Sequence, residues 1–136
     1  MIGGEIITAS YIGKLLEKLK KTSEIDDLVL KGKNYSPEYI NKLQETYKLF
    51  KKNGFEITEH GLNRLLGRIN QGKIGTVDEV INALLNGTTY IDTANGGYVE
   101  FLDGISVHIA DDGFIKTIIG NAKIKETWEL FQEVLR

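Results

Sequence analysis

Cysteine is absent from this sequence of 136 residues, proline occurs once and histidine twice. Without cysteine the chain has no disulfide, no cysteine-ligated zinc, no iron–sulfur cluster and no thiol nucleophile. Two histidines and no dense carboxylate cluster leave few ligands for a structural or catalytic metal. We therefore expect neither a metal nor a cofactor.

Long hydrophobic runs are also missing. No apolar run approaches the roughly 20 residues that a membrane-spanning helix needs, and no signal-peptide pattern opens the chain. We therefore expect no membrane segment in this domain. Hydrophobic residues make up 41% of the chain, which is enough for a core. The length predicts one domain, or one domain with a helical extension.

The charge is slightly acidic and unevenly spread. The formal net charge is −2, and residues 60–120 carry 4 Lys or Arg against 7 acids. Nucleic-acid binders are more often basic, so this balance argues against a broad nucleic-acid surface. Acids that lie on the far side of the fold would not affect such a surface.

Helical periodicity and capping signals occupy the first half of the chain. An apolar stripe predicts an amphipathic helix over residues 10–22. A Ser-Pro start and a glycine stop bound a second helix within residues 36–54. Thr58 can cap a third helix, and a capping box opens a fourth within residues 76–87.

After Gly87 the apolar period changes from helical to two. Short glycine-containing turns separate the apolar runs, which predicts an antiparallel meander. The predicted strands cover residues 88–93, 98–102, 105–110 and 114–119. Apolar residues from Ile124 to Leu135 fit a closing helix. We expect an α+β fold in which N-terminal helices precede a four-stranded antiparallel β-meander and a C-terminal helix. Residues 1–54 would form a helical extension and residues 55–136 the main domain.

The third helix carries a titratable or cationic side chain at every fourth position: His60, Arg64 and Arg68. This spacing places all three on one helix face, opposite an apolar face. An imidazole, which titrates near neutral pH, suits chemistry on a phosphate when guanidiniums lie beside it. The alternative is an ordinary solvated face, with the arginines paired to Glu56, Glu59 or a sheet carboxylate.

Residues 57–120 resemble the C-terminal ribonuclease toxin domains of bacterial polymorphic and contact-dependent growth inhibition toxins. The shared pattern is a helix with His and Arg, a short helix ending in Asn-Gly, a Tyr-Ile-Asp strand and an Asp-Gly hairpin. A last strand of the form Asp-Gly-Phe-Ile-Lys-Thr-Ile-Ile-Gly completes it. The pattern is similar to the superfamily with the barnase, EndoU, colicin and RelE fold. It covers under half of the chain.

The resemblance implies a small metal-independent ribonuclease and a site centred on His60. Such cleavage uses the 2′-OH as the internal nucleophile and needs proton transfer and positive charge at the phosphate. His60 would be the general acid or base. Arg64 and Arg68 would clamp the non-bridging oxygens.

Four further residues complete the expected site. The resemblance maps Thr117 onto a Thr or Ser that contacts the phosphate, although Thr is also a common strand residue. Tyr90 would be the second proton-transfer group or stack on a base, although packing is its commoner role. Lys116 and His108 would bind substrate. His108 alternates with Val107 and Ile109, so we expect it on the other face of the sheet, in a surface or edge role; it would reach the site if that face forms the cleft.

The resemblance thus implies a toxin that cleaves RNA, tRNA in particular, by general acid–base transesterification. Its expected partners are RNA and a cognate immunity protein, with no DNA. It would be delivered as part of a larger secreted or cell-surface toxin and act in the cytoplasm of the target cell. The acidic balance favours the alternative, a non-catalytic protein-binding module such as an immunity or phage-structural domain.

Overall fold

A computed structural model describes residues 25–32 and 34–131. This part of the chain has an α+β fold with three helices and a mixed sheet of six strands. The predicted helix over residues 10–22 lies outside it. The helices are α2 (Pro37–Lys52), α3 (Glu59–Asn70) and α4 (Val77–Asn86). The strands are β1 (Glu56–Ile57), β2 (Thr88–Asp92), β3 (Tyr98–Leu102), β4 (Ile105–Ile109), β5 (Phe114–Ile119) and β6 (Trp128–Leu130).

The three helices begin at the caps that the sequence predicts. Ser36, Thr58 and Thr76 each accept a hydrogen bond from the backbone N–H three residues later. These bonds satisfy N–H groups that the first helical turn leaves without a partner. The chain leaves α2 through Gly54, whose φ of 89° lies in the left-handed region that glycine adopts easily.

The strand order in the sheet is β1-β5-β4-β3-β2-β6. Strands β2 to β5 form the predicted antiparallel meander. The turn between β3 and β4 has positive φ at both Asp103 (50°) and Gly104 (82°), as a tight two-residue hairpin requires. The sheet has two strands more than the four predicted. β1 pairs in parallel with β5, and β6 pairs antiparallel with β2.

The predicted C-terminal helix is wrong where the structure describes it, because β6 occupies its centre. Ile124, Trp128 and Phe131 recur at helical spacing, but Trp128 pairs with Asp92 across β2 and β6. Its indole lies 5.8 Å from the Tyr90 ring, centroid to centroid. A strand here satisfies backbone groups that the edge of β2 would otherwise expose.

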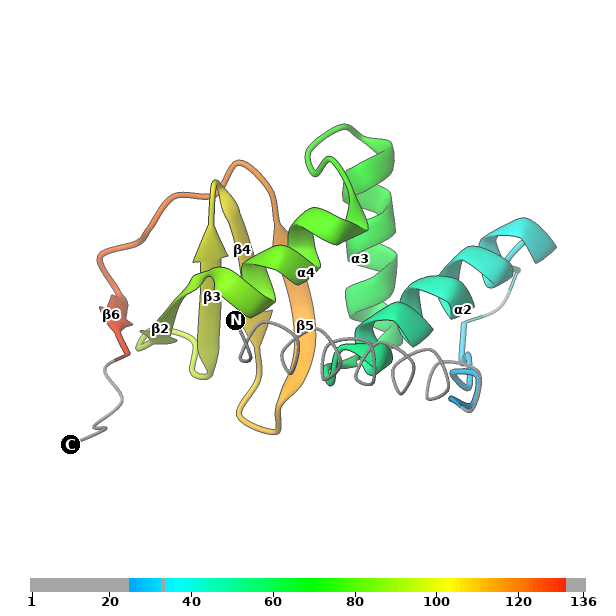
Figure 1. The fold of residues 1–136 in the computed structure, drawn as a ribbon, viewed down its shortest axis with the longest axis horizontal. Helices are drawn as coiled ribbons and strands as arrows, with labels where there is room; N and C mark the ends of the chain where they lie inside the picture. The colour runs from blue at the N-terminus through cyan, green and yellow to red at the C-terminus, as the bar shows by residue number, and fades with distance from the viewer. Residues whose placement is uncertain (1–24, 33, 132–136) are drawn as a thin grey trace, which may run out of the picture.

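The sheet has two different faces (Figure 1). Helix α4 crosses one of them and packs on β3 and β4, while α3 stands beside β5. The opposite face, called the open face below, carries no helix in the described part of the chain. One row of paired residues crosses it from β5 to β2: Thr117, His108, Val99 and Tyr90.

Helix α2 belongs to the same core as the sheet. Leu43 and Phe50 are fully buried in α2 and lie in one apolar cluster with Leu62 and Leu65 of α3. That cluster continues into the core-facing residues of β4 and β5. The described part of the expected extension over residues 1–54 therefore shares its core with the main domain.

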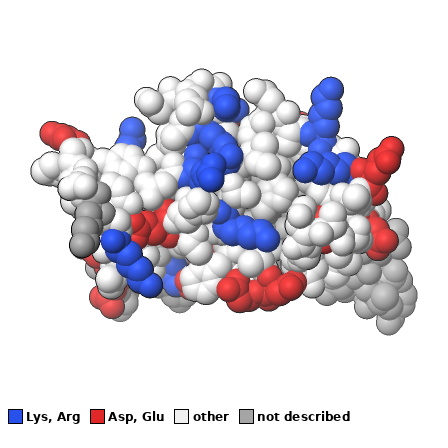
Figure 2. Space-filling model, turned by 180° about the vertical axis from the view of Figure 1, so that it is seen from behind, with Lys and Arg blue, Asp and Glu red and all other residues white. Residues whose placement is uncertain are grey.

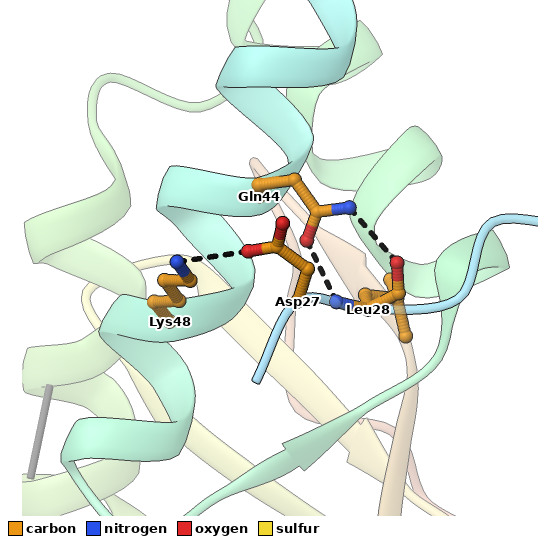
Figure 3. A network of polar contacts seen from close by, with 4 residues as sticks. All are labelled: Asp27, Leu28, Gln44 and Lys48. Carbon is orange, nitrogen blue, oxygen red and sulfur yellow. Dashed lines mark hydrogen bonds and ion pairs between the residues drawn. The ribbon is translucent and has the colours of Figure 1, made fainter. Parts of the chain in front are cut away.

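Side chains of α2 bind the segment before it through hydrogen bonds similar to those between paired strands (Figure 3). The Gln44 amide accepts from the backbone N–H of Leu28 at 2.7 Å and donates to the carbonyl of the same residue at 2.8 Å. Lys48 pairs with Asp27 at 2.8 Å beside it. These contacts fix residues 25–32 against α2 without regular secondary structure.

Truncating Phe50 tests whether α2 and the main domain share one core. We expect Phe50→Ala to lower the free energy of unfolding by about 3–5 kcal/mol, because it leaves a cavity between α2 and α3. Lys42→Ala, on the exposed side of α2, is the matched control. Urea unfolding followed by circular dichroism measures both. A separable extension would instead give a second transition for α2 and an unchanged midpoint for the sheet.

Candidate active site

Five of the predicted site residues line a single open groove between α3 and β5. Its volume is about 430 Å³. We call it the α3–β5 groove. Helix α3 contributes His60, Arg64 and Arg68, and β5 contributes Lys116 and Thr117 together with Ile119. His60 and Arg64 are exposed to solvent, so the cationic face both shares a groove with the last meander strand and faces water.

Arg68 joins the two walls of the groove. Its Nη1 donates to Thr117 Oγ1 at 2.9 Å and to the backbone carbonyl of Ile118. These bonds hold the guanidinium against β5 and orient the Thr117 hydroxyl. Arg64 Nε donates to His60 Nε2 at 3.3 Å. His60 Nε2 is the acceptor in this contact, so this ring nitrogen faces Arg64.

A β-bulge in β5 points two consecutive side chains at the groove. His108 pairs with Thr117 and Ile109 pairs with Ile115, so Lys116 is an extra residue on β5. Ile115 is buried in the core, whereas Lys116 and Thr117 both line the groove. Regular alternation would have turned one of these two side chains to the other face. Bulges often re-aim side chains in this way beside functional sites.

The acids that could neutralise the two arginines have other partners. Glu56 pairs with Lys51. Glu59 accepts from the Tyr35 hydroxyl at 2.6 Å and from the backbone N–H of Lys31 at 2.6 Å. The Tyr35 hydrogen bond is the main cause of the lowered pKa of Glu59. Neither arginine pairs with a carboxylate among the residues described, so the alternative of arginines paired with Glu56, Glu59 or a sheet carboxylate is not observed there.

The local charge differs from the charge of the segment. All 4 Lys and Arg residues of positions 60–120 line the α3–β5 groove or the groove next to it, and no acid lines either one in the described residues. Figure 2 shows Lys and Arg side chains gathered in the middle of this side of the molecule, with acids mainly around them. The acidic balance of the segment therefore does not describe its groove.

Tyr90 lies outside the α3–β5 groove. It is half-buried on β2, three strands from Thr117, and its ring packs on Trp128. Three strand spacings put the two backbones about 14 Å apart. The structure therefore does not bring Tyr90 to His60, and the packing alternative describes its surroundings.

The expectation of a surface or edge position for His108 is wrong. His108 does face away from Val107 and the core, but it is only 8% exposed. Its ring lies 5.8 Å from the Trp128 indole, and its Nε2 lies 3.0 Å from Ser106 Oγ. Trp128, which the periodicity places in a helix, covers this part of the open face. A substrate in the α3–β5 groove would meet Thr117 and not its buried neighbour His108.

Burial is the largest cause of a lowered pKa at His108. The nearby Asp92 carboxylate opposes this effect, while the charges of Lys125, Lys116 and Arg68 reinforce it. Asp92 is itself held ionised: burial raises its pKa, but hydrogen bonds from Asn95 and from the backbone N–H of Ala94 lower it by more. His108 is consequently neutral and packed at neutral pH.

Nothing in the described residues supplies a metal site, because no three His, Asp or Glu side chains gather there. No helix in that part of the chain is long and apolar enough to cross a membrane. Protein-family models, curated proteins and solved structures contain no match to this chain.

Arg68 should contribute more to stability than Arg64. Arg68→Ala leaves Thr117 Oγ1 and the Ile118 carbonyl without their donor, so we expect a loss of about 1–3 kcal/mol in the free energy of unfolding. Arg64→Ala removes only an exposed contact and should change it by less than about 0.5 kcal/mol. Chemical unfolding of both variants measures the difference, and equal losses would contradict the bridging role of Arg68.

The lowered pKa of His108 should make the fold less stable in mild acid. An unfolded histidine takes up a proton near pH 6.5, whereas folded His108 does so only at lower pH. Below about pH 6.5 the unfolded state therefore binds more protons than the folded state. The free energy of unfolding consequently falls as the pH is lowered. We expect His108→Gln to weaken this fall, measured by urea unfolding at about pH 7.5 and about pH 5.5. The carboxylates titrate in both proteins, so their effects on the pH dependence largely cancel. The same pH dependence for the parent and for His108→Gln would refute a lowered pKa at His108.

Proposed function

We propose that this chain is a metal-independent endoribonuclease domain of a bacterial toxin and that the α3–β5 groove is its active site. The observation that carries the proposal is the convergence of His60, Arg64, Arg68, Lys116 and Thr117 in one groove. An acid–base group, three cations and a hydroxyl in a groove without carboxylates match the needs of phosphate transesterification.

His60 is the general base in this proposal. Its Nε2 takes the proton from the ribose 2′-OH while the 2′ oxygen attacks the adjacent phosphorus. Arg64, which donates to the same nitrogen in the free protein, must turn to the phosphate as the substrate binds. The bond from phosphorus to the 5′ oxygen then breaks, leaving a 2′,3′-cyclic phosphate and a 5′-hydroxyl.

Positive charge stabilises the pentacovalent phosphorane. Arg68 is already oriented by Thr117, so it can bind a non-bridging oxygen with little reorganisation. Lys116 is the basic side chain that β5 contributes to the groove. It replaces Tyr90 as the proposed donor of a proton to the 5′ oxygen, because Tyr90 is too distant.

The wider proposal follows the resemblance in the sequence. The RNA substrate is tRNA, a cognate immunity protein blocks the groove, and the domain reaches the cytoplasm of a target cell as part of a larger exported toxin. A non-catalytic protein-binding module is the second candidate. The exposure of His60 and Arg64 in an open groove favours it, since protein partners bind such surfaces.

Cleavage of RNA by groove variants separates the two functions. We expect His60→Ala and Arg64→Ala to lower the rate of cleavage of total tRNA by about 100-fold or more, because they remove the base and a phosphate clamp. Lys42→Ala on the exposed side of α2 should cleave like the parent. Product ends are checked for 2′,3′-cyclic phosphate, and growth inhibition is measured in parallel.

Two results would count against the ribonuclease. Undiminished cleavage by both groove variants would show that the activity lies elsewhere or in a contaminant. A parent protein without cleavage that captures a protein through the same groove would favour the binding module.

A further inference from the structure

A second groove adjoins the α3–β5 groove on the other side of Arg64 and Arg68. Its volume is about 370 Å³. Besides the two arginines it is lined by Asn63, Gly67, Gln71 and Lys73. We call it the Gly67 groove. Arg64 and Arg68 line both grooves, so they form a cationic ridge between them.

Helix α3 builds the Gly67 groove through a second stripe of side chains. Asn63, Gly67 and Gln71 recur every four residues, one position before Arg64, Arg68 and Gly72. A glycine between two amide side chains leaves a notch in the helix surface. A side chain at position 67 would meet no atom within 4 Å of its Cβ, so the notch is open space.

The walls of the notch are held in place. Asn63 accepts from the Tyr39 hydroxyl through Oδ1 and donates to the Tyr35 hydroxyl at 2.9 Å through Nδ2. At the other end, Gly72 (φ 75°) turns the chain back, and the Lys73 N–H donates to the carbonyl of Arg68 at 2.9 Å. This turn places Lys73 beside the ridge instead of beyond the helix end.

Resting on the proposed function, we propose that the Gly67 groove is a second nucleotide subsite. RNA with its scissile phosphate in the α3–β5 groove crosses the Arg64–Arg68 ridge and lays a nucleotide beyond the two that flank this phosphate over Gly67. Lys73 binds the next phosphate, and the amide of Gln71 faces the base. A base can enter this notch only when unstacked, so the substrate class is single-stranded RNA or a tRNA loop.

Charge and shape both support this assignment. Successive phosphates of a single strand need cations in a row, and Lys116, the two ridge arginines and Lys73 follow one another across the two grooves. The described residues place no carboxylate in either groove. A small anionic ligand would use one groove, whereas a polynucleotide gains from both.

Filling the notch is the direct test. A Cβ at position 67 meets open space and leucine favours the helix more than glycine does, so we expect Gly67→Leu to fold at least as well as the parent. Initial rates are compared on a dinucleotide and a hexanucleotide of RNA. We expect Gly67→Leu to lower kcat/KM on the hexanucleotide at least about tenfold more than on the dinucleotide.

Two variants control this comparison. Gly67→Ala adds only a methyl group and should give a smaller loss on the hexanucleotide than Gly67→Leu. Glu45→Leu adds an exposed leucine to α2, away from both grooves, and should leave the ratio of the two rates unchanged. Equal losses on both substrates with Gly67→Leu would overturn the subsite, since they indicate a general defect.

Binding without cleavage separates this inference from the proposed function. His60→Ala protein is titrated into fluorescein-labelled 2′-O-methyl RNA of two and six nucleotides, and anisotropy is read at several salt concentrations. We expect tighter binding of the longer strand. Lys73→Ala in the same background should reduce the salt slope by about 0.7. Length-independent affinity, or no RNA binding at all, would overturn the subsite.

The two failures look different. If the parent cleaves RNA but the Gly67 and Lys73 variants behave like it, the ribonuclease stands and the subsite is wrong. If the parent binds the hexanucleotide through Gly67 and Lys73 but cleaves nothing, the second groove stands as an RNA contact and the catalytic proposal fails.

Discussion

The bond between Arg68 and β5 is the interaction on which the site depends. Its guanidinium reaches from the polar face of α3 to the Thr117 hydroxyl and the Ile118 carbonyl. The apolar face of the same helix is meanwhile buried in the core through Leu62 and Leu65. These contacts on both faces hold α3 in position, so the helix face that carries His60 and Arg64 lies beside the sheet.

Polar clusters elsewhere keep the groove cationic. Glu59 lies one position before His60, yet Tyr35 and the backbone of the 25–32 segment occupy its oxygens. This use of Glu59 anchors the segment before α2 and at the same time prevents the carboxylate from neutralising a ridge arginine. Glu59 thus stabilises the fold and leaves the positive charge of the groove in place.

The open face of the sheet has a covered part toward β2 and a solvent-exposed part toward α3. Trp128 of β6 covers His108 and packs on Tyr90, so the side toward β2 behaves as a second small core. The side toward α3 stays open because no described residue plays the role of Trp128 there. The bulge at Lys116 aims one more cation into that open half. The division explains why only one of the two histidines is available to a ligand.

Local signals in the sequence determined the helices, the meander and the cationic face, because caps, tight turns and helical spacing act over a few residues. Tertiary structure alone decided the rest. β6 forms because the edge of β2 offers a partner, which overrides the helical spacing around Trp128. Trp128 of that strand in turn covers His108 and packs on Tyr90. The bulge at Lys116 depends on the register against β4, and the notch at Gly67 becomes a groove only because the chain folds back to bring Lys73 beside Arg68. Long-range pairing produced all of these features except the local fold-back at Lys73, and pairing partners cannot be read from local periodicity.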